Sequence, residues 1–202
     1  MAISLSLQGS MAAGKTTAIK YIQHNAPNIN ISYETNVNVI EEIKQRGLDK
    51  NELHDYVEIQ KLWIANEISR WHKAQKYSCS IMDFGAEEIE FYTLNYPKSI
   101  GVQWDIEQIL SKELQELRKC LPNRVLFLKA ELRTLHMHKE NDASRTRNFF
   151  DHYVEHLLPL KNQWFLGREG VDILNIDGYS KDEVGQFVLG WINSIVNSTL
   201  IV

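Results

Sequence analysis

One segment near the start of the chain constrains the fold more than any other. It matches the pattern GxxxxGK[ST], follows a short apolar run, and reads Gly9-Ser10-Met11-Ala12-Ala13-Gly14-Lys15-Thr16. Glycines and small residues let the backbone curl until several N–H groups point at one anion, and the helix predicted to begin there adds its positive dipole end. The segment therefore predicts a strand–loop–helix unit that holds phosphate groups.

The chemistry of this loop suits a nucleoside triphosphate. We expect the backbone from Gly9 to Thr17 to surround the phosphates. The Lys15 ammonium can reach the β and γ phosphates, and the Thr16 hydroxyl is placed to bind Mg²⁺. ATP and Mg²⁺ are therefore the expected donor and metal ion.

The order of elements indicates an α/β protein. Five short runs rich in β-forming residues are each followed by a segment with helical spacing of apolar residues. These runs are 3–7, 28–33, 77–82, 124–128 and 171–176. The alternation predicts a five-stranded parallel sheet with helices on both faces.

Length, charge and cysteine content exclude several other classes. A chain of 202 residues suits a single domain. Cys79 and Cys120 allow at most one disulfide, which favours a reducing compartment such as the cytoplasm. A net charge of −4 argues against binding to nucleic acid polymers, and no apolar run approaches the length of a membrane span. We expect a small-molecule partner, and a homodimer is possible.

The class of nucleotide-binding protein can be narrowed by motifs. The guanine-binding pattern [NT]KxD does not occur in the sequence, which argues against a GTPase. Large oligomeric ATPases need a longer chain. A small phosphoryl-transfer enzyme is therefore the leading class.

Several segments together resemble the P-loop nucleoside and nucleotide kinases, most of all the deoxynucleoside kinase branch, over most of the chain. Besides the phosphate loop at 9–16, these are Glu34 after the second strand, Gln60 in the long helix expected at 51–76, Asp83-Phe84-Gly85 after the third strand, and a polar segment at 139–147. The resemblance implies a three-layer P-loop NTPase fold over 1–202, with a five-stranded sheet and a short lid at about 139–147.

The resemblance also implies roles for individual residues. Glu34 falls where the family has its general base, and Gln60 where it has an amide that reads the nucleobase. Arg145 and Arg147 resemble the arginines of the lid, which clamp the transferred phosphate, and Lys139 is a weaker member of that segment.

The acidic residues can also be placed by fold. Parallel sheets bind ligands at the carboxyl ends of their strands, so Glu34 and Asp83 should lie on the side of the phosphate loop. We assign Asp83 to Mg²⁺ or to the acceptor, with Glu87 or Glu88 as possible substitutes. Trp63 can either stack on a base or sugar or belong to the core.

The sequence departs from the kinase pattern at two places. Phe84 stands where the deoxynucleoside kinases have an arginine, and the Pro and Trp that usually follow the strand-end acid are absent after Glu34. A kinase whose acceptor is a sugar, an antibiotic or another alcohol therefore stays open as an alternative. A nucleotide-binding sensor without catalysis is a further alternative.

One competing motif lies near the carboxyl end. The segment from His152 to His156 matches HxxEH, in which two histidines four residues apart can share a zinc ion. Zinc catalysis also needs a third ligand and an open coordination position, for which the sequence offers no clear candidate. The apolar residues of the same segment already explain it as a core helix.

Overall fold

The computed structural model describes residues 2–142 and 148–199. Its five strands form one parallel sheet in the order β2-β3-β1-β4-β5. They are β1 (Ile3–Gly9), β2 (Asn30–Ser32), β3 (Cys79–Asp83), β4 (Arg124–Lys129) and β5 (Val171–Asn175). Every strand expected from the sequence is confirmed, as is the parallel sheet.

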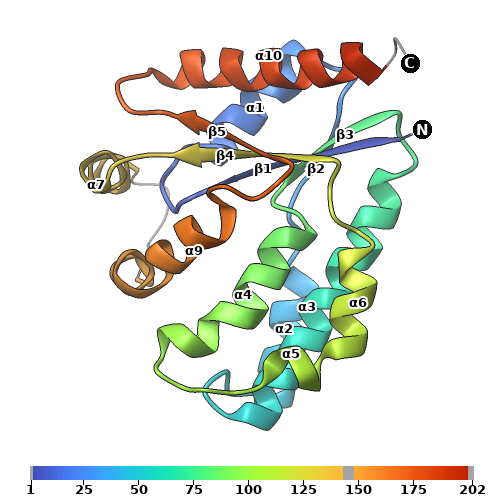
Figure 1. Cartoon of the computed structure of the whole chain (residues 1–202), viewed down its shortest axis with the longest axis vertical. Helices are drawn as coiled ribbons and strands as arrows, with labels where there is room; N and C mark the ends of the chain where they lie inside the picture. Colours follow the sequence, from blue (N-terminus) through green and yellow to red (C-terminus); the bar gives the residue numbers. More distant parts are fainter. Residues whose placement is uncertain (1, 143–147, 200–202) are drawn as a thin grey trace.

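Helices connect the strands and cover both faces of the sheet (Figure 1). The helices are α1 (Lys15–Asn25), α2 (Val37–Arg46), α3 (Leu53–Ala74), α4 (Ala86–Ser99), α5 (Ile106–Ile109), α6 (Ser111–Arg118), α7 (Leu132–Glu140), α8 (Phe150–His152), the π-helix η1 (Tyr153–Leu157), α9 (Leu158–Phe165) and α10 (Lys181–Thr199). Helices α1 and α10 lie above the sheet in the view of Figure 1, and α3, α4 and α9 lie below it. This is the three-layer arrangement predicted from the sequence.

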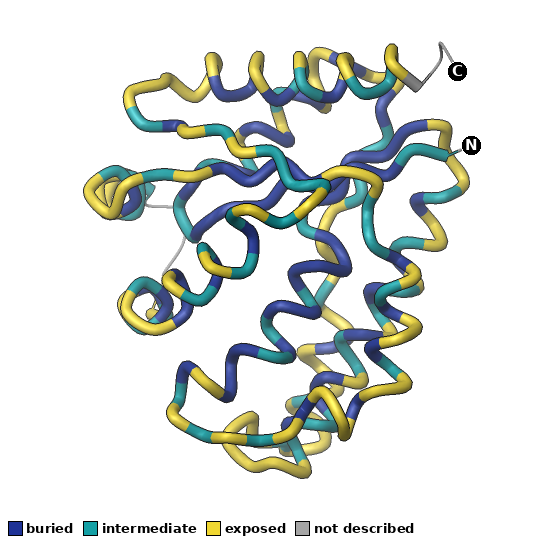
Figure 2. Tube along the Cα trace, viewed as in Figure 1, coloured by how far each residue is buried: buried dark blue, intermediate teal, exposed yellow. Residues whose placement is uncertain are grey.

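The central strand shows why the sheet is the core of the molecule. Strand β1 alternates apolar and polar residues, a pattern that usually marks a strand with one face in water. Here both faces are buried, and the trace in Figure 2 is dark blue along this strand. On its polar face, Ser6 and Gln8 both donate hydrogen bonds to the buried Glu87 carboxylate of α4. The polar residues of β1 thus bind a helix to the sheet instead of facing solvent.

The strand register brings the carboxyl ends of three strands to one edge. Leu7 of β1 pairs with Asp83 of β3, and Ser32 of β2 pairs with Met82. The phosphate loop leaves β1 at Gly9, and Glu34 follows two residues after Ser32. The loop and both predicted carboxylates therefore lie at the same edge of the sheet.

A search of the described residues for a helix long and apolar enough to cross a membrane finds none.

Candidate active site

The phosphate loop is shaped by its glycines and by strand β4. Gly9 has a φ of 147°, and a Cβ atom at this position would lie 2.7 Å from the carbonyl oxygen of Leu128. Gly14, with a φ of 82°, is the N-cap of α1, and Ala12 also has a positive φ of 64°. Glycine adopts positive φ without strain, so the two glycines of the pattern stand where the backbone geometry requires them, whereas Ala12 adopts its positive φ at a cost. The loop ends at the N-terminus of α1, as predicted.

Lys15 lies folded against its own loop. Its Nζ donates hydrogen bonds to the carbonyl oxygens of Gly9, at 2.9 Å, and Ser10, at 2.7 Å. Burial, together with the nearby Lys161 ammonium, lowers the pKa of Lys15 to about 7. The lysine predicted to bind phosphate thus lies at the loop, where burial and Lys161 outweigh the favourable charges of Glu88, Asp83 and Glu34.

A cavity of about 420 Å³ opens beside the phosphate loop. At one end it touches Gly9 and Lys15, and Glu34 and Glu88 line its wall. The rest of the wall is mostly aromatic: Tyr56, Trp63, Phe84, Tyr92, Tyr96, Phe149 and Tyr153. Its volume falls within the ~300–1,000 Å³ typical of small-molecule sites.

Gln60 and Trp63, which were singled out from the sequence, both line this cavity from α3. The Thr93 hydroxyl of α4 donates a 2.8 Å hydrogen bond to Gln60 Oε1 and fixes the amide against the wall. One turn earlier on α3, the Tyr56 hydroxyl bonds to the carbonyl oxygens of Tyr92 and Thr93. Helices α3 and α4 are thereby held together, and α3 presents an amide and an indole to a ligand.

Glu34 lines the cavity, whereas Asp83 at the end of β3 is buried, with only 9% of the residue exposed. Although Glu34 remains accessible to solvent, the cavity walls partly desolvate its carboxylate, and Glu88 and Asp83 repel its negative charge. All three effects raise the pKa of Glu34 above its ordinary value. A carboxylate with a raised pKa accepts a proton more readily, as a general base requires.

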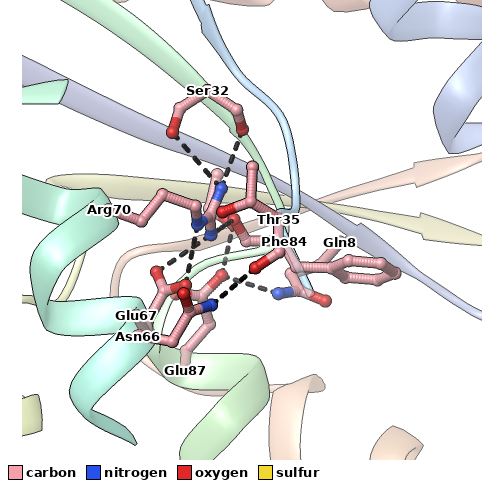
Figure 3. A network of polar contacts seen from close by, with 9 residues as sticks. Gln8, Ser32, Thr35, Asn66, Glu67, Arg70, Phe84 and Glu87 are labelled. Atoms are coloured by element: carbon pink, nitrogen blue, oxygen red, sulfur yellow. Dashed lines mark hydrogen bonds and ion pairs between the residues drawn. The ribbon is translucent and has the colours of Figure 1, made fainter. Parts of the chain in front are cut away.

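A buried arginine fixes the strand ends that carry these acids. Arg70 of α3 forms a two-bond ion pair with Glu67, at 2.8 and 2.9 Å (Figure 3). It also donates 2.7 Å hydrogen bonds to the carbonyl oxygens of Ser32, at the end of β2, and Phe84, just after β3. Because a guanidinium group is planar and rigid, the arginine sets the spacing between the two strand ends.

Phe84 itself has a strained backbone. Its φ of 62° lies in the left-handed region, which bulky residues adopt at a cost of about 1–3 kcal/mol. The hydrogen bond from Arg70 to its carbonyl oxygen holds it there, and its ring faces the ammonium groups of Lys15, at 4.8 Å, and Lys161, at 5.6 Å. Where the resembling kinases have a cation, this chain has an aromatic ring that contacts two cations from other elements.

The two acidic residues after Gly85 have different surroundings. Glu87 points at β1, where Ser6 and Gln8 hold its carboxylate, while Glu88 lines the cavity. Glu88 Oε1 accepts a 2.6 Å hydrogen bond from Lys161 Nζ of α9. Of the two substitutes considered for Asp83, Glu88 is therefore the one placed at the site.

The donor set fits Mg²⁺ better than it fits zinc. Thr16 and Asp83 offer a hydroxyl and a carboxylate, and Mg²⁺ is usually bound by one or two such oxygens together with substrate phosphates. Among the described residues, no group of three or more His, Cys, Asp or Glu side chains could hold a metal ion. His152 Nε2 lies 3.3 Å from the Ser99 hydroxyl, and His156 lies 3.7 Å from Glu155.

The predicted lid is described in part. Arg145 and Arg147 lie outside the described residues. Lys139, the weaker member of the segment, forms a 2.9 Å ion pair with Asp151 and stacks over Phe150. Helix α7, which leads into the segment, touches the phosphate loop where His138 Nδ1 donates to the Ala12 carbonyl oxygen at 2.9 Å.

Comparison with known proteins gives one informative result. No protein-family model matches the chain, and no curated protein matches it. Among solved structures, the chain is similar to a thymidylate kinase from Candida albicans, with a TM-score of 0.70 and 13% sequence identity, over 97% of this chain and 93% of that one. The chain therefore shares the fold of this structure. The fold inferred from the resemblance is thereby confirmed.

Sequence reasoning missed Lys161 and Arg70. Both are charged residues on a helix. Lys161 lies four residues after Leu157 and four before Phe165, on an apolar face, and Arg70 lies three residues after Glu67, on the same face as that acid. A charged residue within an apolar stripe signals a buried ion pair, but the spacing does not say which element supplies the partner. The structure supplies it from α4 for Lys161 and from α3 itself for Arg70.

Proposed function

We propose that this protein is an ATP- and Mg²⁺-dependent kinase that transfers a phosphoryl group to a hydroxyl or phosphate of a small molecule, preferably a nucleoside or a nucleotide. The observation that carries the proposal is the continuous cavity, which joins the phosphate loop at Gly9 and Lys15 to an aromatic pocket and places Glu34 on its wall. A sensor that only binds a nucleotide has no need of such a pocket.

For a hydroxyl acceptor, the reaction assigns a role to each element of the site. The acceptor oxygen forms a bond to the γ phosphorus, the bond between that phosphorus and the β,γ-bridging oxygen breaks with its electron pair going to ADP, and the hydroxyl proton passes to Glu34. Lys15 and the loop amides balance the charge on the phosphates. Thr16 and Asp83 would hold Mg²⁺, which would supply further charge neutralisation.

Two observations favour a nucleoside or nucleotide over a sugar. Aromatic side chains line most of the cavity, which suits a planar base better than a polyhydroxylated ring. Gln60, held by Thr93, offers one polar group on an otherwise apolar wall. The name of the similar structure, a thymidylate kinase, agrees with a nucleotide acceptor.

The donor's base has a candidate position on the other side of the loop. A small cavity of about 30 Å³ lies beside Gly14 and Thr17 and is lined by His138, Ile176 and Tyr179, among others. It adjoins the carboxyl end of β5, where the resembling kinases close over adenine. We assign this side of the loop to the adenine of ATP.

A panel assay tests the proposal. The protein is incubated with ATP and Mg²⁺ and, separately, with nucleosides, nucleoside monophosphates, sugars and aminoglycosides, and ADP release is followed. We expect stimulation by a nucleoside or a nucleoside monophosphate. Stimulation by sugars or aminoglycosides alone would identify a non-nucleoside alcohol as the acceptor. No stimulation across the panel would favour a nucleotide-binding sensor without catalysis.

A further inference from the structure

Lys161 of α9 is a lysine buried at the meeting point of the phosphate loop and the cavity. Only 1% of the residue is exposed. Its Nζ donates to Glu88 Oε1 at 2.6 Å and to the Gly9 carbonyl oxygen at 3.2 Å. Four aromatic rings, those of Phe84, Phe91, Tyr92 and Phe165, surround the ammonium group at 5.6–5.9 Å. A charge in so apolar a place needs anionic partners to be stable.

This lysine shares its surroundings with Lys15. Both ammonium groups donate to the same oxygen, that of Gly9, and both face the ring of Phe84. Glu88 pairs with Lys161 from one side, but the two ammonium groups still repel each other across the Gly9 carbonyl, and an anion that contacts both relieves that repulsion. The arrangement is therefore suited to a doubly contacted phosphate.

The Glu88 carboxylate does not complete a closed ion pair. Its Oε2 atom is buried and has no hydrogen-bond partner among the described residues. A pair kept only for stability is expected to have its polar atoms satisfied, since each unsatisfied one costs free energy. The unpartnered oxygen can accept from a ligand hydroxyl or N–H but not from a phosphate, so a phosphate at this wall would contact the ammonium groups and not Glu88.

We propose that Lys161 is a second phosphate-binding lysine, which contacts the terminal phosphate of the bound nucleotide from the acceptor side while Lys15 contacts it from the loop. This inference rests on the proposed function and extends it by one catalytic residue. Lys161 supplies, from α9, a cation at the place where Phe84 stands instead of arginine. Lys161 acts through its positive charge alone and forms no covalent bond in the reaction.

The experiment separates the charge of Lys161 from its structural role. Lys161→Met alone leaves Glu88 buried without a partner and can unfold the protein, so the informative variant is the double change Lys161→Met with Glu88→Gln, compared with Glu88→Gln alone. Affinities for ADP and for a non-hydrolysable ATP analogue are measured with Mg²⁺ and without acceptor, alongside thermal unfolding. The matched control, Arg118→Met with Glu90→Gln, removes the ion pair between Arg118 of α6 and Glu90 of α4.

Relative to Glu88→Gln, the double variant is expected to keep its affinity for ADP and to lose about 100-fold in affinity for the ATP analogue. The control should leave the ratio of the two affinities unchanged. If the double variant has the same ratio of the two affinities as Glu88→Gln, Lys161 is only a counterion and the inference is overturned, whatever the two unfolding temperatures are.

The inference and the proposed function fail in different ways. The affinity ratio is measured without an acceptor, so it tests Lys161 whether or not turnover occurs. If the affinity ratio depends on Lys161 but the wild-type protein phosphorylates nothing in the panel, the proposed kinase function is overturned and the phosphate-binding role of Lys161 stands. Acceptor-stimulated turnover together with an unchanged affinity ratio would support the kinase function and overturn the role of Lys161.

Discussion

The two ends of the cavity are built in different ways. The phosphate end is mainly one continuous segment, 9–17, to which we assign most of the phosphate-binding chemistry through its backbone and Lys15. The acceptor end is assembled from side chains of α3, α4, η1 and the segments between elements, which are far apart in the sequence. Under the proposed function, phosphate, a ligand group common to many proteins, is bound by a local motif, and the acceptor, a group specific to this protein, by tertiary packing.

The largest effect is expected at the phosphate end. Lys15→Ala removes the charge that balances the β and γ phosphates, so turnover should fall on the order of 10³-fold. The measurement is ADP release with the best acceptor of the panel. A unimodal unfolding transition confirms that the variant is folded, and wild-type turnover in a folded Lys15→Ala protein would disprove the assignment of the loop.

At the junction of the two ends, Glu34→Gln tests the proton acceptor. The amide keeps the size of the side chain but cannot take a proton, so kcat should fall on the order of 10²-fold while nucleotide affinity is retained. Asp83→Asn is the comparison variant. If kcat falls only in Asp83→Asn, the base is Asp83 and not Glu34.

The contacts of Arg70 that join the ends of β2 and β3 should matter for the stability of the protein. Arg70→Met leaves Glu67 buried and unpaired and removes the hydrogen bonds to Ser32 and Phe84. The free energy of unfolding should fall by about 3 kcal/mol, measured by urea denaturation. Arg118→Met, which breaks a more exposed ion pair, is expected to cost less. Equal losses of unfolding free energy in the two variants would contradict the role of Arg70 in holding the two strand ends.

The sequence predicts the phosphate end almost completely and the acceptor end only in part. The loop is readable because its chemistry depends on backbone conformations that only certain residues allow, such as those of Gly9 and Gly14. Glu34 and Gln60 were found through resemblance and do line the cavity. Lys161 and the Phe84 ring were not assigned to the site, because their roles depend on contacts between α9, β3 and the loop that no local pattern encodes.

At the acceptor end alone, Gln60→Leu should raise the KM for the acceptor about tenfold with little change in the KM for ATP, because one hydrogen bond to the base is lost from an apolar wall. Leucine fills a similar volume, and the Thr93 hydroxyl loses its partner as well. Thr93→Val therefore serves as the control for that second loss. If Thr93→Val raises the acceptor KM as much as Gln60→Leu does, the amide acts only by holding α3 against α4.

The smallest effect is a pH dependence of nucleotide binding. Lys15 has a pKa lowered to about 7 by burial and by Lys161, against the opposing charges of Glu88, Asp83 and Glu34. Below pH 7 the ammonium is charged before the nucleotide arrives, and above it binding must take up a proton. The apparent Kd for the ATP analogue should therefore rise about fivefold from pH 7 to pH 8.

Calorimetry in buffers of different ionisation enthalpy measures that proton directly. Lys15→Arg keeps a positive charge that does not titrate in this range, so its affinity should change less over the same interval. The same pKa bears on folding with a definite sign. Between pH 7 and the ordinary lysine value the unfolded chain holds the proton and the native protein does not, so this residue makes the free energy of unfolding increase as the pH rises. Equal pH dependence of nucleotide affinity in Lys15→Arg and the wild type would show that another group titrates, and would remove Lys15 as the residue through which the phosphate end responds to pH.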